Sequence, residues 1–168
     1  MSQVSSPELS AAAIEDLRRR FPYQQDERWV AEQARKAGSW VEANRAFLAW
    51  HRERGAAEMK ALIEALGLTT APSAAQAADL VALAYDVFMP PEEYRGTIVR
   101  VDDTRLRIVV GVCPMYGKIE AAEWHGVTAC GSWHHRRGWY DAMGIDPEDS
   151  LIAEQKWGDA ACIAEVEF

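Results

Sequence analysis

The sequence predicts an α+β fold in which N-terminal helices pack on a four-stranded antiparallel sheet made of two hairpins, with a helical Cys/His-rich insert between them. Two observations predict it. Apolar residues recur at helical spacing through residues 1–91, and from residue 95 they alternate with polar residues as they do in strands. We therefore expect one domain over 1–168, with a helical half (1–91) and a hairpin–insert–hairpin half (95–168).

The helical half carries recognisable start and stop signals. Ser6-Pro7-Glu8 combines a hydroxyl cap, an N1 proline and an acid in the first turn, so it predicts the start of the first helix, which Pro22 ends. The helical pattern is interrupted at Gly55 and resumes after it. Glycine, proline and capping residues predict the remaining helix boundaries, which are Asp26, Gly38-Ser39, Gly55, Gly67, Ser73 and Pro90-Pro91.

The first hairpin is predicted around a two-residue turn at Asp102-Asp103. This turn sets Val99 opposite Leu106 and predicts an apolar, buried face. The residues expected on that face are Thr97, Val99, Val101, Thr104, Leu106 and Ile108. The opposite face, with Arg100, Arg105 and Arg107, is expected to face water.

The second hairpin is predicted around Gly158-Asp159, a pair typical of a type II′ turn. A two-residue turn there sets Gln155 opposite Cys162 on the core-facing side. Ala164 and Val166 continue that side, and the outward-facing residues are expected to be Glu154, Lys156, Glu165 and Glu167.

Composition excludes several classes of partner. The net charge is −8 and the pI is near 5.0, so the surface repels nucleic acid and anionic membranes. No apolar run is long enough to span a bilayer, and the first residues lack the pattern of a secretory signal. Three widely spaced cysteines do not form a disulfide framework, which favours a cytoplasmic protein.

The segment from Cys113 to Tyr140 is where we expect the chemistry. It holds two of the three cysteines, three of the four histidines and three tryptophans, and glycines break it into short pieces. Titratable groups among aromatic walls are what a site for a small-molecule ligand or substrate requires.

One interpretation of this segment is catalysis by a thiol. Cys130 precedes a predicted helix beginning at Gly131-Ser132, and the amide groups of a helix N-terminus favour a thiolate. His134 lies four residues later and is the candidate acid–base partner, with His125 as a second catalytic group.

A second interpretation is a metal, with zinc as the candidate cofactor. Cys113, His125, Cys130 and one of His134 or His135 make a set of two cysteines and two histidines, although their spacing matches no standard zinc pattern. The third interpretation is structural: the tryptophans fill the space between sheet and helices, and the histidines are ordinary core or surface groups.

Other residues are candidates for binding the substrate. His51 continues an apolar helical stripe with Asn44 and is expected to point inward, and Arg136 is a candidate fork for a carboxylate. The aromatic candidates for the walls of the site are Tyr116, Trp124 and Trp133.

The order of elements also resembles two related groups of proteins. Cys113-Pro114 with Tyr116, then Cys130, then Gly158-Asp159 with Cys162 are similar to positions in the L-2-amino-thiazoline-4-carboxylic acid hydrolase-like family and in V4R-type small-molecule-binding domains. The resemblance covers about residues 85–168. The block from Trp133 to Tyr140 matches neither group.

The resemblance to the hydrolase-like family implies water-driven opening of a C–N bond in a small heterocyclic or amide-like substrate, with Cys113 and Cys130 as site candidates. The resemblance to V4R domains implies instead a non-catalytic module that binds an apolar small molecule, beside a zinc held partly by cysteines. Exposed hairpin edges could also pair two copies in a homodimer.

Overall fold

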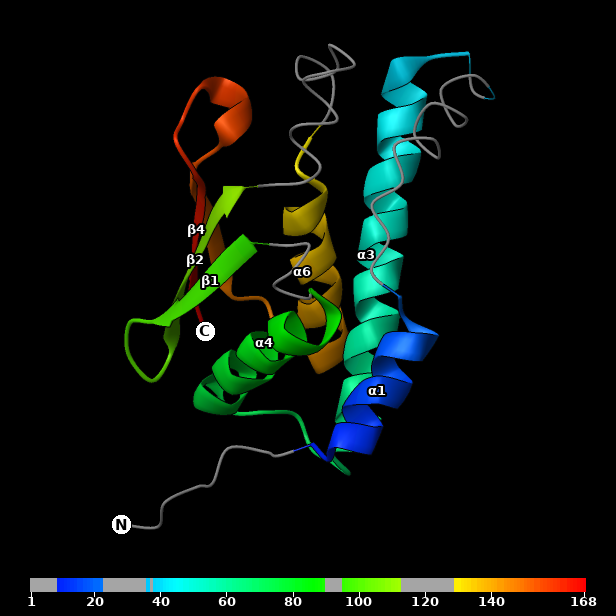
Figure 1. Cartoon of the computed structure of the whole chain (residues 1–168), viewed down its shortest axis with the longest axis vertical. Helices are drawn as coiled ribbons and strands as arrows, with labels where there is room; N and C mark the ends of the chain where they lie inside the picture. The colour runs from blue at the N-terminus through cyan, green and yellow to red at the C-terminus, as the bar shows by residue number, and fades with distance from the viewer. Residues whose placement is uncertain (1–8, 23–35, 37, 90–94, 113–128) are drawn as a thin grey trace.

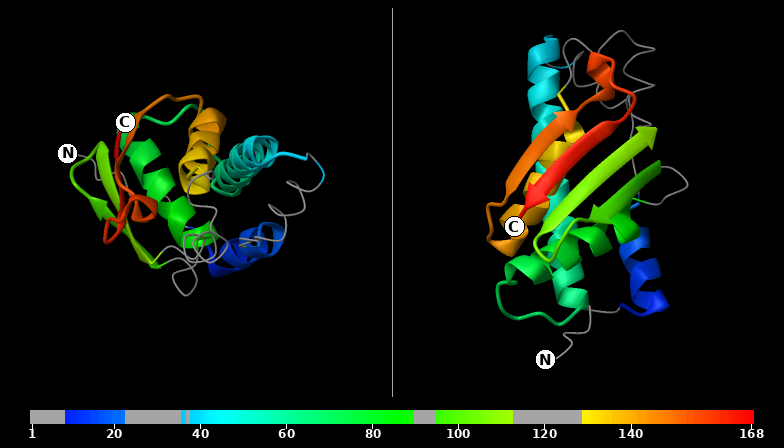
Figure 2. Two further views of the ribbon diagram at one scale, coloured as in Figure 1. Left: turned by 90° about the horizontal axis from the view of Figure 1, so that it is seen from above. Right: turned by 90° about the vertical axis from the view of Figure 1, so that its left-hand side faces the viewer.

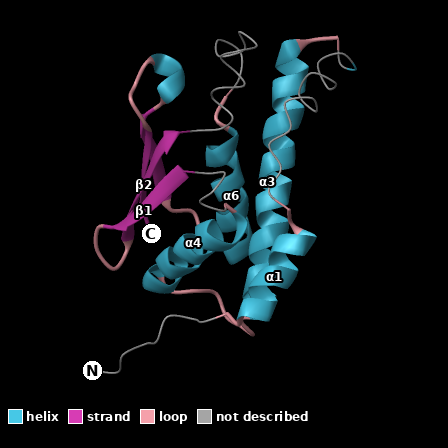
Figure 3. Cartoon of the chain, viewed as in Figure 1, coloured by secondary structure: helices cyan, strands magenta, loops and turns pink. Residues whose placement is uncertain are grey.

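The computed structural model describes residues 9–22, 36, 38–89, 95–112 and 129–168. Three helices precede the sheet: α1 (Ala11–Arg20), α3 (Trp40–Ala65) and α4 (Ala74–Phe88). The strands are β1 (Arg95–Arg100), β2 (Arg105–Val112), β3 (Glu148–Ala153) and β4 (Cys162–Glu167). In the order of the chain, helix α6 (Gly131–Met143) comes between the two hairpins, and a 3₁₀ turn, η1 (Gln155–Trp157), follows β3 (Figure 3).

The elements form the predicted α+β architecture. The sheet is antiparallel with the order β1-β2-β4-β3, so the two hairpins join through β2 and β4. All four described α-helices lie on one side of it, and its other face is uncovered by any described helix (Figures 1 and 2). Helices α4 and α6 lie next to the sheet, and the core is the apolar layer between them and the inward side chains of β2 and β4.

Three of the predicted helix boundaries are confirmed by their capping geometry. The Ser39 side chain accepts a bond from the Glu42 amide, Ser73 and Gln76 form a reciprocal capping box, and Gly67 ends α3 with φ +65°. The prediction that Ser6 begins the first helix is wrong: Ser10 is the N-cap of α1 and accepts from the Ala13 amide. Asp26, Pro90 and Pro91 lie outside the described residues.

The expected break at Gly55 is also wrong, because α3 runs without interruption through it. Gly55 serves close packing instead: a Cβ there would lie 2.1 Å from the His135 carbonyl oxygen of α6. Gly138 of α6 packs equally closely on α3. The two helices run parallel, as the contacts Asn44–Ala129 and Arg52–Asp141 show, and glycines at the crossing let the backbones meet (Figure 1).

The register predicted for the first hairpin is wrong by one residue. Val101 pairs with Arg105 around a three-residue loop, because the Asp102 carboxylate accepts a bond from the Thr104 amide and shapes the turn. One residue of slip turns every β1 side chain to the other face. Val99 is consequently 43% exposed, and Arg100 lies on the helix side, where it pairs with Asp79 of α4. The predicted inward direction of Leu106 and Ile108 is confirmed.

The second hairpin also departs from a two-residue turn. η1 and Gly158, with φ +95°, occupy the connection, and Leu151 pairs with Ala164 rather than with Val166. Gln155 nevertheless lies beside Cys162, because its amide donates to the Cys162 sulfur at 3.3 Å. Ala164 and Val166 are buried as predicted, and Glu165 and Glu167 face outward. None of the described helices is long and apolar enough to cross a bilayer.

Replacing Gly138 with alanine tests the close packing of α3 on α6. The new Cβ would lie 2.0 Å from the Arg52 carbonyl oxygen and 2.8 Å from the Ala56 amide nitrogen, and backbone atoms cannot rotate away. We expect Gly138→Ala to lower the free energy of unfolding by at least about 2 kcal/mol in urea titrations. Gly111→Ala is the matched control, since among the described residues no atom beyond its chain neighbours lies within 4 Å of its Cβ position. Equal stability of the two variants would contradict this packing.

Candidate functional site

A chain of three buried side chains joins α3 to α6. Glu58 Oε2 lies 2.5 Å from His135 Nε2, and His135 Nδ1 lies 3.3 Å from His51 Nδ1. Their exposed fractions are 2% for Glu58, 4% for His135 and 7% for His51. Because α3 supplies both ends and α6 supplies the middle, the chain exists only when the two helices are packed together.

Glu58 is held in its charged form by several donors. Arg54 Nε donates to Oε1 at 2.7 Å, and Trp139 Nε1 donates to Oε2 at 3.3 Å. Burial alone raises the pKa of this carboxyl group, but the charges and hydrogen bonds of His135 and Arg54 outweigh it and leave the pKa below its ordinary value. A carboxylate anion is therefore fixed at one end of the chain.

The anion sets the positions of the protons along the chain. A carboxylate only accepts hydrogen bonds, so His135 Nε2 carries the proton that it donates to Glu58. While His135 is neutral, its Nδ1 is an acceptor and His51 Nδ1 is the donor, so a neutral His51 presents Nε2 with a free lone pair. When His135 is protonated, the roles of the two Nδ1 atoms reverse and His51 Nε2 carries the proton.

Among the described residues nothing forms a hydrogen bond with His51 Nε2, although the atom is buried. Burial, followed by the charges of His135, His134 and Arg54, lowers the pKa of His51 to about 3, so the ring is neutral at physiological pH. Phe47 packs edge-on against the ring, and a Cβ at Gly131 would lie 2.7 Å from Nε2. The free nitrogen is thus directed at the first turn of α6.

Cys130 is the N-cap of α6, as predicted, but it faces the sheet. Its side chain lines a small apolar pocket together with Cys162, Val110 and Leu151. Both of these thiols are free and half-buried, and burial raises the pKa of Cys162. Position 130 has extended backbone angles, so the four-residue spacing to His134 does not stack the two side chains as it would within a helix.

His134 lies in different surroundings from Cys130, and no hydrogen bond joins them. Burial and the cations Arg52 and Arg137 lower the pKa of His134, and its ring packs edge-on against Trp133. Trp133 in turn donates its indole N–H to the Asp149 carbonyl at 3.2 Å. The expected pairing of Cys130 with His134 therefore has no contact to support it.

Arg136 is engaged by a second buried network, on the sheet side of α6. Asp149 accepts from Nε at 2.9 Å and from Nη2 at 2.8 Å, and it also accepts from the Tyr140 hydroxyl at 2.8 Å. Burial holds the pKa of Tyr140 well above its usual value. A substrate carboxylate could bind Arg136 only by displacing Asp149, so this network ties α6 to β3.

The metal interpretation finds little support in the described residues. Both ring nitrogens of His135 are engaged, one by Glu58 and one by His51, so this ring offers no lone pair to an ion. No group of three or more histidine, cysteine, aspartate or glutamate side chains within the described part of the chain could hold a metal. Four candidates lie outside the described residues: Cys113, Tyr116, Trp124 and His125.

Glu58 is the functional candidate that sequence reasoning missed. The signal lay in the spacing of Asn44, His51 and Glu58, which are seven residues apart and therefore share one helical face. All three contact the segment around α6: Asn44 accepts from the Ala129 amide at 3.1 Å, and the other two bond to or through His135. A polar residue every second turn of an apolar stripe predicts a partnered network.

Comparisons with models of known protein families, with curated proteins and with solved structures found no match for this chain. The site is therefore interpreted from its own geometry.

The low pKa of His51 predicts how stability depends on pH. The folded chain resists protonation of His51 down to about pH 3, whereas the unfolded chain takes up a proton near pH 6.5. This contribution is fully present above pH 6.5 and is lost as the pH falls toward 3. By linkage, His51 alone removes about 2 kcal/mol of the unfolding free energy between pH 7.5 and pH 5.

Urea titrations at these two pH values measure the loss. His51→Gln should flatten the dependence by most of that amount, because glutamine does not titrate. His134→Gln is the matched control and should flatten it less, since His134 is only half-buried. Identical pH profiles for wild type and His51→Gln would show that His51 is not held neutral.

Proposed function

We propose that this chain is a hydrolase in which Glu58, His135 and His51 form a proton relay and His51 Nε2 acts as the general base. The single observation that supports it is the buried nitrogen of His51, which has no hydrogen-bond partner in the described part of the chain, at one end of a series of side chains whose other end is a carboxylate. The substrate class, a small heterocyclic or amide-like molecule with a scissile C–N bond, rests on the sequence resemblance.

An imidazole with a pKa of about 3 is by itself a weak base, and the relay compensates for this by moving the positive charge away from His51. When Nε2 accepts a proton from an attacking water, the Nδ1 proton of His51 can move to His135 Nδ1. His51 is then neutral again, and the positive charge lies on His135 beside the Glu58 carboxylate. Return of the proton to the leaving nitrogen breaks the C–N bond and restores the starting state.

Neighbouring groups adapt the relay to this task. Arg54 and Trp139 fix the Glu58 carboxylate, and the edge-on ring of Trp139 also packs against His135. Burial keeps water from competing for these hydrogen bonds, which strengthens each of them. Nε2 faces the first turn of α6. Phe47 and Gly131 are the described residues that cover it.

A second candidate is a small-molecule-binding module without catalysis. It would use the apolar pocket that contains Cys130 and Cys162, which has a volume of about 30 Å³ and must widen to hold a ligand. The pocket lies on the opposite side of α6 from the relay, so its occupant would not contact His51. The two candidate functions therefore use residues on different sides of α6, and variants on each side can distinguish them.

Activity is tested on a panel of cyclic C–N substrates: 2-amino-2-thiazoline-4-carboxylate, hydantoin and dihydrouracil, with ring-opened products measured by mass spectrometry. We expect turnover of at least one substrate, and a loss in kcat of roughly 100-fold or more in His51→Gln and in Glu58→Gln, since general base catalysis contributes about that much. Water as the nucleophile requires that Cys130→Ser stay active.

His134→Gln is the matched control for removal of an imidazole from the same helix pair, and it should retain activity. Circular dichroism confirms that each variant is folded. Absence of turnover on the whole panel, together with saturable binding of an apolar dye that Cys162→Trp blocks, would support the binding module instead. Loss of activity in Cys130→Ser but not in His51→Gln would assign the chemistry to the thiol.

A further inference from the structure

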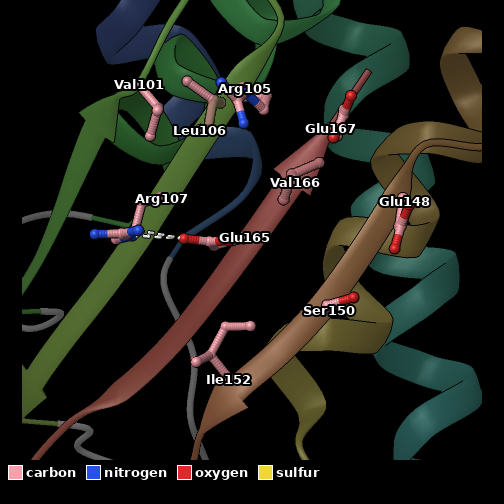
Figure 4. A pocket seen from close by; sticks show the side chains of 10 residues that line it. All are labelled: Val101, Arg105, Leu106, Arg107, Glu148, Ser150, Ile152, Glu165, Val166 and Glu167. Carbon is pink, nitrogen blue, oxygen red and sulfur yellow. Dashed lines mark hydrogen bonds and ion pairs between the residues drawn. The ribbon is translucent and has the colours of Figure 1, made fainter.

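The outer face of the sheet carries an ordered pattern of side chains. Three rows cross it at right angles to the strands, and strand pairing defines each row. The first row contains Thr97, Val109 and Ile163. The second contains Val99, Arg107, Glu165 and Ser150, and the third contains Val101, Arg105, Glu167 and Glu148. Figure 4 shows the residues of the second and third rows, except Val99, lining one shallow groove.

Along each strand the outward-facing residues form a column, and the two central columns carry opposite charges. β2 presents the cations Arg105 and Arg107, and its neighbour β4 presents the anions Glu165 and Glu167. The flanking strands add apolar surface: Val99 is 43% exposed, Val101 47% and Ile152 59%. Arg107 Nε donates to Glu165 Oε1 at 2.8 Å across the boundary between the two columns, and both side chains remain about half exposed.

We propose that this outer face binds the same face of a second copy of the chain, forming a two-fold symmetric dimer. A two-fold axis that lies in the interface, parallel to the strands and between β2 and β4, exchanges the two columns. Each β2 then faces the β4 of the other copy, and every row meets its own equivalent. Arg107 of one copy comes over Glu165 of the other, Arg105 over Glu167, and Val109 over Ile163.

The charge pattern selects this axis over the alternative. A two-fold axis perpendicular to the strands would set β2 over β2, bringing arginines onto arginines and glutamates onto glutamates, which is repulsive. The arrangement with exchanged columns sets Arg105 and Arg107 over Glu167 and Glu165 and also sets Val109 over Ile163. At the edge of the face it sets Glu148 over Val101. It is also the aligned packing that two sheets adopt face to face, with the strands within about 30° of one another.

The size of the face sets the expected strength. Four strands about 4.8 Å apart and about 20 Å long cover roughly 400 Å². Standard interfaces bury about 800 Å² on each partner, so this face has about half the standard size and the dimer should be weak and reversible on dilution. This inference is independent of the proposed hydrolase activity, because the relay lies on the other side of the sheet, between α3 and α6.

Charge reversal provides a decisive experiment. In one variant, Arg105→Glu with Arg107→Glu, both columns are acidic; in the other, Glu165→Arg with Glu167→Arg, both are basic. Sedimentation velocity from 5 to 500 µM in 0.1 M salt should show a wild-type monomer–dimer equilibrium. Each variant alone should be monomeric at every concentration, and an equimolar mixture should form a heterodimer at least as tightly as wild type.

Arg19→Glu with Arg45→Glu is the matched control, because it changes net charge equally at exposed positions on α1 and α3. It should dimerise as wild type does. Circular dichroism and urea titrations show whether the sheet variants fold, and recovery of association in the mixture excludes a folding defect as the cause. A monomeric wild type at 500 µM would overturn the proposal, as would variants that still dimerise alone or that stay monomeric when mixed.

Discussion

The parallel packing of α3 on α6 is the constraint on which the rest of the structure depends. Gly55 and Gly138 let the two backbones approach until a Cβ on either glycine would overlap a carbonyl oxygen of the other helix. At that separation Glu58 and His51 of α3 both reach the single His135 ring. A wider crossing would leave a buried carboxylate without its imidazole, so the glycines and the polar chain require one another.

Helix α6 is also held from its other side, which fixes its rotation. Arg136 and Tyr140 project toward the sheet and meet Asp149 of β3, whose side chain is fully buried. Buried ion pairs contribute little net stability, because the loss of hydration offsets much of their attraction. Their role here is to fix geometry. His135 pairs with Glu58 on one side of α6, and Arg136 pairs with Asp149 on the other, so rotation of α6 would leave both buried carboxylates without their partners.

The sequence predicted the layers and the two hairpins of one antiparallel sheet, because periodicity and capping act locally. It failed where one side chain decides the outcome. Asp102 accepts from the Thr104 amide and makes a three-residue turn, which reversed the direction of Val99 and Arg100. The buried chain of Glu58, His135 and His51 was predicted only in part. His51 was identified as inward-facing, but Glu58 lies 77 residues from His135 in sequence, and helix periodicity does not reveal which two helices pack together.

The same separation explains why the dense Cys/His segment was a poor guide to which side chains act together. Cys130, His134 and His135 are neighbours in sequence, yet α6 sends them to the sheet side, toward Arg52 and Arg137, and into the α3 interface. A helix distributes successive residues around its axis, so clustering in sequence implies clustering in space only at spacings of three, four or seven. His51 and Glu58 satisfy that condition on α3, and Gly131, His135 and Gly138 satisfy it on α6. The residues that meet are therefore those with matching periodicity on the two helices, and the His135 ring in the middle of the chain is held by α3 residues on both of its nitrogens.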